Sequence, residues 1–365
     1  MARDEPFASH GDSRVDDLAR RLRPARGWTD IALRWPSADG RRGVDRRVWA
    51  DGSVTLGPCS VVNIWCGVKP AAAMLMLSLL EERGIGVDDP IGDHFPGPLL
   101  GELGAASSAQ VLANALDLHR VGLVEARLAE LDDLDALVQR ERAALLPLDG
   151  RRALSEFSLW WVVDNLIRSL CGRSPLDELA SRLDADGLDM FFGDQPEHQL
   201  PYGRIACLLE ASPSGDLPLL HDQLIRENRR WHLGFGGFAS ARGLADLYFG
   251  IGNRLDERTP LSSPSRLLPS GDLLRMLFDG GRADAMGPSI AGLARLDVEI
   301  LGRSESCCPR LIGHFGWSGI SVGLLDRSTG LGLGIVCTDL AESCERIKAA
   351  AEYVIDDFSI ARSPS

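Results

Sequence analysis

The sequence contains almost no lysine. Of its 39 basic residues, 37 are arginine, and Lys69 and Lys348 are the only lysines. Lysine differs from arginine because it can lose its proton when it is buried and then act as a base. Lys69 lies in an apolar segment. We therefore interpret it as a functional residue; the alternative is that one of two lysines falls there by chance.

The sequence also lacks the features of a membrane protein or a nucleic-acid-binding protein. It has no run of about 18 apolar residues, which a membrane-spanning helix needs, and residues 1–6 do not form the apolar core of a signal peptide. The net charge of −13 argues against a general affinity for nucleic acid or anionic membrane. Three arginine-rich segments have acidic residues nearby, and we interpret them as solvated faces: residues 20–26, 41–47 and 226–230. We expect a cytoplasmic protein without nucleic-acid or membrane partners.

The eight cysteines form no CxxC pair and no Cys/His spacing typical of a metal site. Reduced thiols fit a cytosolic chain, and we expect neither a metal nor a cofactor. The apolar fraction of 45% and the charged fraction of 25% are ordinary for a soluble globular protein. A chain of 365 residues is long enough for one large domain or two smaller ones.

Local patterns predict regular structure near both ends of the chain. Apolar spacing predicts two helices and two strands, the strands joined by a turn at 37–40: helices at 15–22 and 340–353, strands at 29–35 and 46–49. The acidic, leucine-rich run 124–146 has helical spacing and predicts a lid or a surface helix. For residues 1–12 we predict a disordered N-terminus.

One stretch carries the strongest chemical signal. Residues 65–70 read Trp-Cys-Gly-Val-Lys-Pro and open an apolar helical pattern that stops near Gly84. Cys66 and Lys69 are three residues apart, so their side chains share one helix face. A helix N-terminus and a neighbouring ammonium both favour the thiolate, the nucleophilic form of cysteine. We predict that Cys66 is a nucleophile and that Lys69 assists it.

A nucleophile-x-x-Lys pattern at a helix start resembles the first motif of the serine β-lactamase and penicillin-binding-protein superfamily, closest to its class C and esterase branch. Further segments resemble that family in the same order: Leu-Glu-Glu-Arg-Gly at 80–84, Val-Asp-Asp-Pro-Ile at 87–91, His-Phe-Pro at 94–96, Leu-His-Arg-Val-Gly-Leu at 118–123, a helix start at 234–247 and Phe-Gly-Trp-Ser-Gly at 315–319. Together these segments extend the resemblance over most of the chain.

The resemblance implies an α/β (α+β) fold of the β-lactamase type, with an antiparallel sheet flanked by helices plus a helical lobe. We expect a single domain over residues 13–362. Its sheet lobe would comprise residues 13–65 and 271–362, and its helical lobe residues 66–270. The active site would then lie between the lobes, with Cys66 at its base.

The chain departs from the family pattern at three motif positions. Cys66 holds the position of the usual serine. Leu154 falls where the second motif supplies a tyrosine, and leucine cannot take a proton. The third motif, commonly Lys-x-Gly or His-x-Gly, reads Trp317-Ser318-Gly319, and a tryptophan there recurs in the esterase branch.

By the same resemblance, the backbone N–H of Cys66 and one from the strand near Gly319 or Ile320 form an oxyanion hole. Ser155 and Glu156 either orient an amine or only cap the helix that follows. His314 would face opposite to Trp317 on a strand, and we interpret it as a packing residue. The expected substrate-binding residues come from the second and third motifs: Leu154, Ser155, Glu156, Trp317, Ser318 and Gly319.

A thiol needs less activation than a serine hydroxyl, so the change to Cys66 and the loss of the tyrosine are chemically compatible. Without a tyrosine to activate water, hydrolysis of an acyl-enzyme should slow, whereas amines attack a thioester well. The sequence therefore predicts an ATP-independent acyltransferase that forms an amide from a small ester or thioester donor and an amine. It resembles transacylases of antibiotic biosynthesis such as the capuramycin-type amide-forming enzymes. Two alternatives stay open: a thiol-dependent esterase or amidase, and an inactive protein that binds a ligand or partner.

Overall fold

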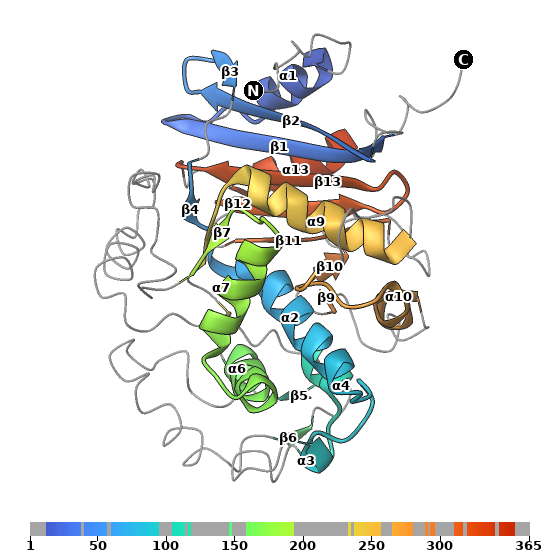
Figure 1. The fold of residues 1–365 in the computed structure, drawn as a ribbon. Coiled ribbons are helices and arrows are strands. Elements are labelled where there is room, and N and C mark those ends of the chain that lie inside the picture. The colour runs from blue at the N-terminus through green and yellow to red at the C-terminus, as the bar shows by residue number, and fades with distance from the viewer. Residues whose placement is uncertain are drawn as a thin grey trace, which may run out of the picture.

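The main element of the fold is an antiparallel sheet built from the two ends of the chain (Figure 1). The computed structural model describes residues 12–37, 40–56, 60–94, 104–113, 116–117, 146–147, 158–192, 233–234, 237–256, 265–279, 289–290, 293–295, 310–316, 320–339 and 343–354. Within these residues the sheet has eight strands in the order β3 (Val54–Leu56), β2 (Gly40–Trp49), β1 (Trp28–Ser37), β13 (Leu331–Cys337), β12 (Ser321–Asp326), β11 (Leu311–Phe315), β10 (Leu293–Arg295) and β9 (Ser289–Ile290).

The N-terminal and C-terminal strands meet at the centre of this sheet. β1 pairs with β13 from Thr29↔Cys337 to Arg34↔Gly332. Every residue of β12 and β13 is buried, which is the pattern of central strands that are covered on both faces. The predicted strands and their antiparallel arrangement are therefore confirmed, and β1 and β2 extend beyond the predicted bounds.

Helices cover both faces of the sheet. α1 (Asp12–Arg21) and α13 (Ser343–Tyr353) pack on one face, where Leu18 and Ile347 join a core with Ile31 and Leu33 of β1. The two predicted terminal helices are thus confirmed, and α1 already begins at Asp12, the last residue of the segment predicted to be disordered. Residues 1–11 lie outside the described part.

α9 (Ala241–Asp256) packs on the opposite face of the sheet. Its sequence range falls in the part expected to form the helical lobe, yet it lies directly on β13. Glycines make this approach possible: a Cβ added to Gly334 would lie 2.0 Å from the Ala241 carbonyl oxygen, and one added to Gly332 would lie 2.5 Å from that of Ala245.

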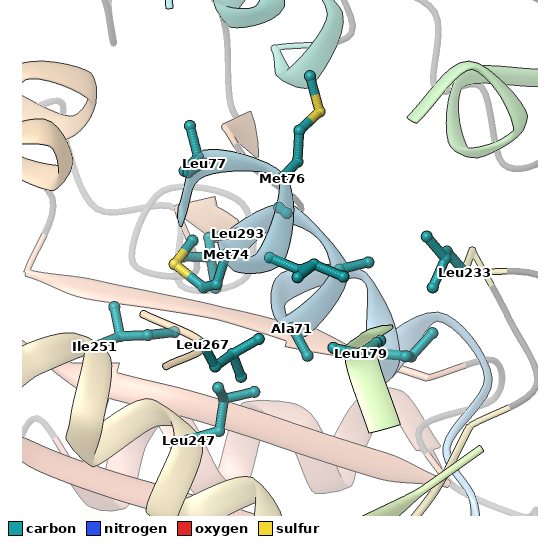
Figure 2. Close-up of a cluster of buried hydrophobic side chains, with 14 of the residues drawn as sticks. Ala71, Met74, Met76, Leu77, Leu179, Leu233, Leu247, Ile251, Leu267 and Leu293 are labelled. Carbon is teal, nitrogen blue, oxygen red and sulfur yellow. The ribbon is translucent and has the colours of Figure 1, made fainter. Parts of the chain in front are cut away.

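α2 (Lys69–Glu82) runs below α9 and forms the centre of the second core. All its residues from Lys69 to Leu80 are buried, as expected for a helix that is apolar on every side. Figure 2 shows Ala71, Met74 and Leu77 among side chains that come from several other elements, including Leu247 and Ile251 of α9.

The remaining elements surround α2 (Figure 1). They are α3 (Ile91–His94), α4 (Ser108–Leu112), α6 (Ser158–Cys171), α7 (Pro175–Ala185) and α10 (Gly271–Asp279), with the short strands β4 (Val62–Asn63), β5 (Leu116–Asp117), β6 (Leu146–Pro147), β7 (Met190–Phe191) and β8 (Phe238–Ala239). The helix predicted over 124–146 falls outside the described residues except for Leu146, which belongs to β6. Among the described helices, none combines the length and apolar character that crossing a membrane requires.

Candidate active site

Cys66 lies on a strained turn between β4 and α2. It belongs to η1, a 3₁₀ helix over Trp65–Val68 that leads directly into α2. Trp65, the residue before it, has φ = +48° and is the one non-glycine residue with a positive φ in the described part of the chain. Such a conformation costs about 1–3 kcal/mol and persists only where the surroundings enforce it.

Buried partners hold this turn in place. The Trp65 N–H donates to Oδ1 of Asn63 at 2.8 Å, and the Ile64 N–H donates to the carbonyl of Gly237 at 2.9 Å. Trp65, Gly67 and Val68 are buried, whereas Cys66 is partly exposed. The turn therefore fixes its neighbours in the core and presents the cysteine to solvent.

The junction of β11 and β12 forms a second wall against the same turn. The Ser321 hydroxyl donates to the Ile64 carbonyl at 2.9 Å, and the Gly316 N–H donates to the Ser321 carbonyl at 2.8 Å. A Cβ on Gly316 would lie 2.4 Å from the Ile64 oxygen, and one on Gly67 would lie 2.8 Å from the Ser321 hydroxyl. The backbones of the turn and of this strand junction therefore touch, with no room for side chains between them.

Lys69 is the first residue of α2 and is 3% exposed. Pro70, which follows it, suits a helix start because its missing N–H would have no acceptor there. Neither an ion pair nor a hydrogen bond engages the Lys69 ammonium within the described residues, and no hydrogen bond joins it to Cys66. The structure thus places the predicted pair one turn apart, with the lysine buried and the thiol partly open.

The two residues predicted to supply oxyanion-hole N–H groups lie on the two touching segments. Cys66 is in the first turn of η1, where backbone N–H groups lack an acceptor within the helix. Ile320 is buried next to Ser321, and its carbonyl accepts from the Cys337 N–H at 2.9 Å. Their role as an oxyanion hole stays a prediction.

The predicted substrate-binding residues lie outside the described residues, both those of the second motif and those of the third: Leu154, Ser155, Glu156, Trp317, Ser318 and Gly319. Gly316 and Ile320, which flank the third-motif segment, are described and lie beside the Cys66 turn. The roles of the six residues stay predictions.

Sequence reasoning missed a second His-x-Gly pattern, His314-Phe315-Gly316. His314 is half-buried at the end of β11 and pairs with Gly323 of β12. Because side chains alternate along a strand, His314 shares the face of β11 on which Gly316 meets the Ile64 carbonyl. The His-x-Gly pattern could have identified His314 as a candidate site residue, since it is one of the two common forms of the third motif.

No exposed tyrosine takes the place of the missing one within the described residues. Tyr248 and Tyr353 are both buried in the cores, and Tyr202 lies outside the described part. Burial raises the pKa of Tyr248 well above its usual range, so it cannot serve as a base near neutral pH. The described residues also include no group of three or more His, Cys, Asp or Glu that could hold a metal ion.

The structure thus places Cys66 at the start of a buried helix and against the junction of β11 and β12. The sequence profile of the Beta-lactamase family matches residues 38–355, and the chain belongs to this family. The resemblance of the sequence to the β-lactamase and penicillin-binding-protein superfamily is therefore confirmed.

Solved structures agree on the fold. A penicillin-binding protein homolog from Caulobacter crescentus has a TM-score of 0.68 and 17% identity, with 96% of this chain and 99% of that chain covered. The D-amino acid amidase from Ochrobactrum anthropi SV3 has a TM-score of 0.66 and 15% identity, with 96% and 99% covered. EstCE1, described as a hydrolase with promiscuous acyltransferase activity, has a TM-score of 0.63 and 13% identity, with 94% and 100% covered. No curated protein matches the chain.

Proposed function

We propose that the protein is an ATP-independent acyltransferase in which Cys66 carries the acyl group and an amine accepts it. The observation that carries this proposal is the position of Cys66. It is the partly exposed residue of a strained turn whose neighbours are buried, and the buried Lys69 follows it by one helical turn. Backbone strain of this kind concentrates at functional sites.

The reaction proceeds in two displacements. The Cys66 thiolate attacks the carbonyl carbon of an ester or thioester donor, the bond to the donor's alcohol or thiol breaks, and that leaving group takes up a proton. The amine then attacks the resulting thioester, the C–S bond breaks, and the Cys66 sulfur leaves as thiolate while the amine loses a proton. Lys69 and His314 are the two candidates to accept that proton, because both lie on segments that adjoin the turn.

Two observations favour transfer to an amine over transfer to water. The tyrosine that would activate water is replaced by Leu154, and the described tyrosines are buried. A protein of the same fold, EstCE1, is described as having promiscuous acyltransferase activity. Small-molecule donors and amines of secondary metabolism, as in antibiotic biosynthesis, are the substrates we propose.

The alternatives predict different fates for the acyl group. A thiol-dependent esterase or amidase would form the same acyl-Cys66 but release it to water. The amidase from Ochrobactrum anthropi SV3 shows that the fold is compatible with such an activity. An inactive binding protein would form no acyl-Cys66.

The first experiment measures whether Cys66 is acylated and where the acyl group then goes. The protein is incubated with p-nitrophenyl acetate, with and without benzylamine, and peptide mass spectrometry locates the acetyl group while chromatography quantifies amide and acid. The ester also acylates benzylamine directly, so the reaction without protein is subtracted. Above that background we expect acetyl-Cys66, and amide in excess of acid when the amine is present. Cys66→Ala should lose both. Cys171→Ala is the matched control, because Cys171 is also partly exposed, and it should lose neither.

Other outcomes separate the hypotheses. Acetyl-Cys66 that yields only acid would establish the hydrolase and reject the transferase. If no acetyl-Cys66 forms, and iodoacetamide labels Cys66 no faster than Cys171, the hypothesis that the protein is an enzyme with Cys66 as its nucleophile is rejected. Cys337 provides a baseline, because burial raises the pKa of its thiol and it should not label in the native protein.

A further inference from the structure

A concavity of about 320 Å³ lies between β1, β2 and the start of α9. Four arginines and two aspartates line it: Arg34, Arg41, Arg42, Arg242, Asp45 and Asp246. It is at the far end of the sheet from Cys66. Arg34 pairs with Gly332 of β13, whereas Ser321, which binds the Cys66 turn, pairs with Val336. These positions are about 13 Å apart along β13 at roughly 3.3 Å per residue.

Three of the arginines are fixed by the two carboxylates. Asp246 accepts from Nε of Arg34 and from Nη1 of Arg41, each at 2.8 Å. Asp45 accepts from Nη1 of Arg34 at 2.7 Å and from Nη2 of Arg242 at 2.6 Å. The Arg34 side chain is 7% exposed. These five residues therefore form a rigid floor whose geometry is set by charge-assisted hydrogen bonds.

Arg42 is the fourth arginine of the concavity, and the two carboxylates do not bind it. It lines the same concavity, and within the described residues it makes no hydrogen bond and no ion pair. Its neighbour Gly43 keeps the site open, because a Cβ there would lie 2.6 Å from Nη1 of Arg34. Arg41 and Arg42 are exposed, so the arginine-rich segment 41–47 keeps its solvated face and also lines this surface concavity.

The local charge is opposite to that of the whole chain. Four guanidinium groups and two carboxylates give the concavity a formal charge of +2, whereas the chain carries −13. The local excess of positive charge therefore favours an anion at this place. Arg242 also lies in the first turn of α9, whose N-terminal end adds partial positive charge.

We propose that this concavity binds the phosphate group of a small molecule. A phosphate monoester carries a charge close to −2 at neutral pH, which balances the local excess. Guanidinium groups are suited to it because their planar donors match phosphate oxygens in pairs. Arg42 supplies donors that no described protein group uses, above a floor that Arg34 holds in place.

Calorimetric titration with two probes tests the site at constant ionic strength. Inorganic phosphate represents the free ion, and glycerol 3-phosphate represents an esterified phosphate. The probe that binds more tightly shows which of the two forms the site prefers. We expect saturable binding of one or both, weakened about tenfold in Arg42→Gln, as the loss of a charge-assisted hydrogen bond implies. The control is Arg168→Gln on α6, which removes the same charge from an exposed side chain and should leave the affinity unchanged.

Three results would overturn the proposal. The first is an absence of saturable binding for both probes. The second is an equal loss of affinity in Arg42→Gln and Arg168→Gln. The third is a titration signal from potassium chloride equal to that from the probes. Because the readout is binding and neither variant touches the Cys66 turn, the outcome is independent of whether Cys66 carries an acyl group.

Discussion

At the scale of single residues, the two lysines have opposite environments. Lys348 is half-exposed and lies 3.9 Å from Glu352, as expected for a surface charge. Lys69 is buried in α2, and no ion pair with it occurs among the described residues. An ammonium group that stays charged when it is buried lowers the stability of a fold unless a counter-charge offsets it. We predict that a role beside Cys66 is the reason why a lysine occupies this position.

Lys69→Met tests this explanation. Methionine has a similar shape without the charge, so we expect the free energy of unfolding to rise by about 1 kcal/mol, while acetylation of Cys66 is lost. Urea unfolding and the acetylation assay measure the two effects. A variant that is less stable than the parent, or that keeps its reactivity, would contradict the assignment of Lys69 to the site.

Asp30 and Arg47 form a buried pair on neighbouring strands. Arg47 donates to both Asp30 oxygens, at 2.6 and 2.7 Å, and its guanidinium lies 3.6 Å from the centre of the Trp28 ring. Burial raises the pKa of Asp30 from 3.8 to about 6, while the hydrogen bond from Arg47 opposes that rise. The folded state thus holds a proton that the unfolded state has released, and stability falls as pH rises from about 4 to 6.

Removing Arg47 should make the free energy of unfolding depend more steeply on pH. Arg47→Met leaves a buried carboxylate unpaired, and we expect a loss of about 3 kcal/mol at pH 7. The loss should be smaller at pH 5, where Asp30 can take up a proton, and urea unfolding at the two pH values measures the difference. The double variant Asp30→Asn/Arg47→Met should show no such difference; an equal loss at both pH values in the single variant would refute this account.

At the scale of elements, the site depends on the contact between the Cys66 turn and the junction of β11 and β12. Gly316→Ala would place a methyl group 2.4 Å from the Ile64 carbonyl and 2.5 Å from the Ser321 hydroxyl. We expect a loss of about 2 kcal/mol from overpacking, together with altered alkylation of Cys66 by iodoacetamide. Phe315→Leu is the control, because the neighbouring Phe315 side chain is partly exposed. Unchanged alkylation in Gly316→Ala would show that the strand does not position the turn.

At the same scale, the sequence predicted elements better than it predicted their contacts. Spacing alone predicts the helix that starts at Lys69, the strands at 29–35 and 46–49 and a helix near each end of the chain. It did not single out Gly316 or Ser321, because both contact Ile64, which is up to 257 residues away in sequence. His314 was interpreted as a packing residue, although its His-x-Gly pattern was visible.

At the scale of the whole molecule, α9 connects the core around α2 to the sheet. Its Leu247 and Ile251 belong to the core around α2, and its backbone lies directly on β13. Gly334→Val would place a Cβ 2.0 Å from the Ala241 carbonyl and should lower the free energy of unfolding by about 3 kcal/mol. Leu333→Met, a volume-conserving change at a neighbour on the opposite sheet face, should cost less than about 1.5 kcal/mol. Equal midpoints of urea unfolding for the two variants would contradict this close packing.

The single domain over residues 13–362, the cytoplasmic location and the absence of partners beyond small molecules stay predictions at this scale. The family, in contrast, is established by the match over residues 38–355.

The sequence by itself determined the Cys-x-x-Lys motif and the rarity of lysine that drew attention to it, and the order of its motifs carries the resemblance that implies the class of fold. The motifs are local properties, since periodicity and spacing depend on residues within a few turns of one another. Only the tertiary structure decided that Trp65 is held with a positive φ, that Gly316 touches the turn, and that four arginines surround two aspartates at the far end of the sheet. Each of these depends on backbones brought together from distant parts of the chain, which local patterns do not encode.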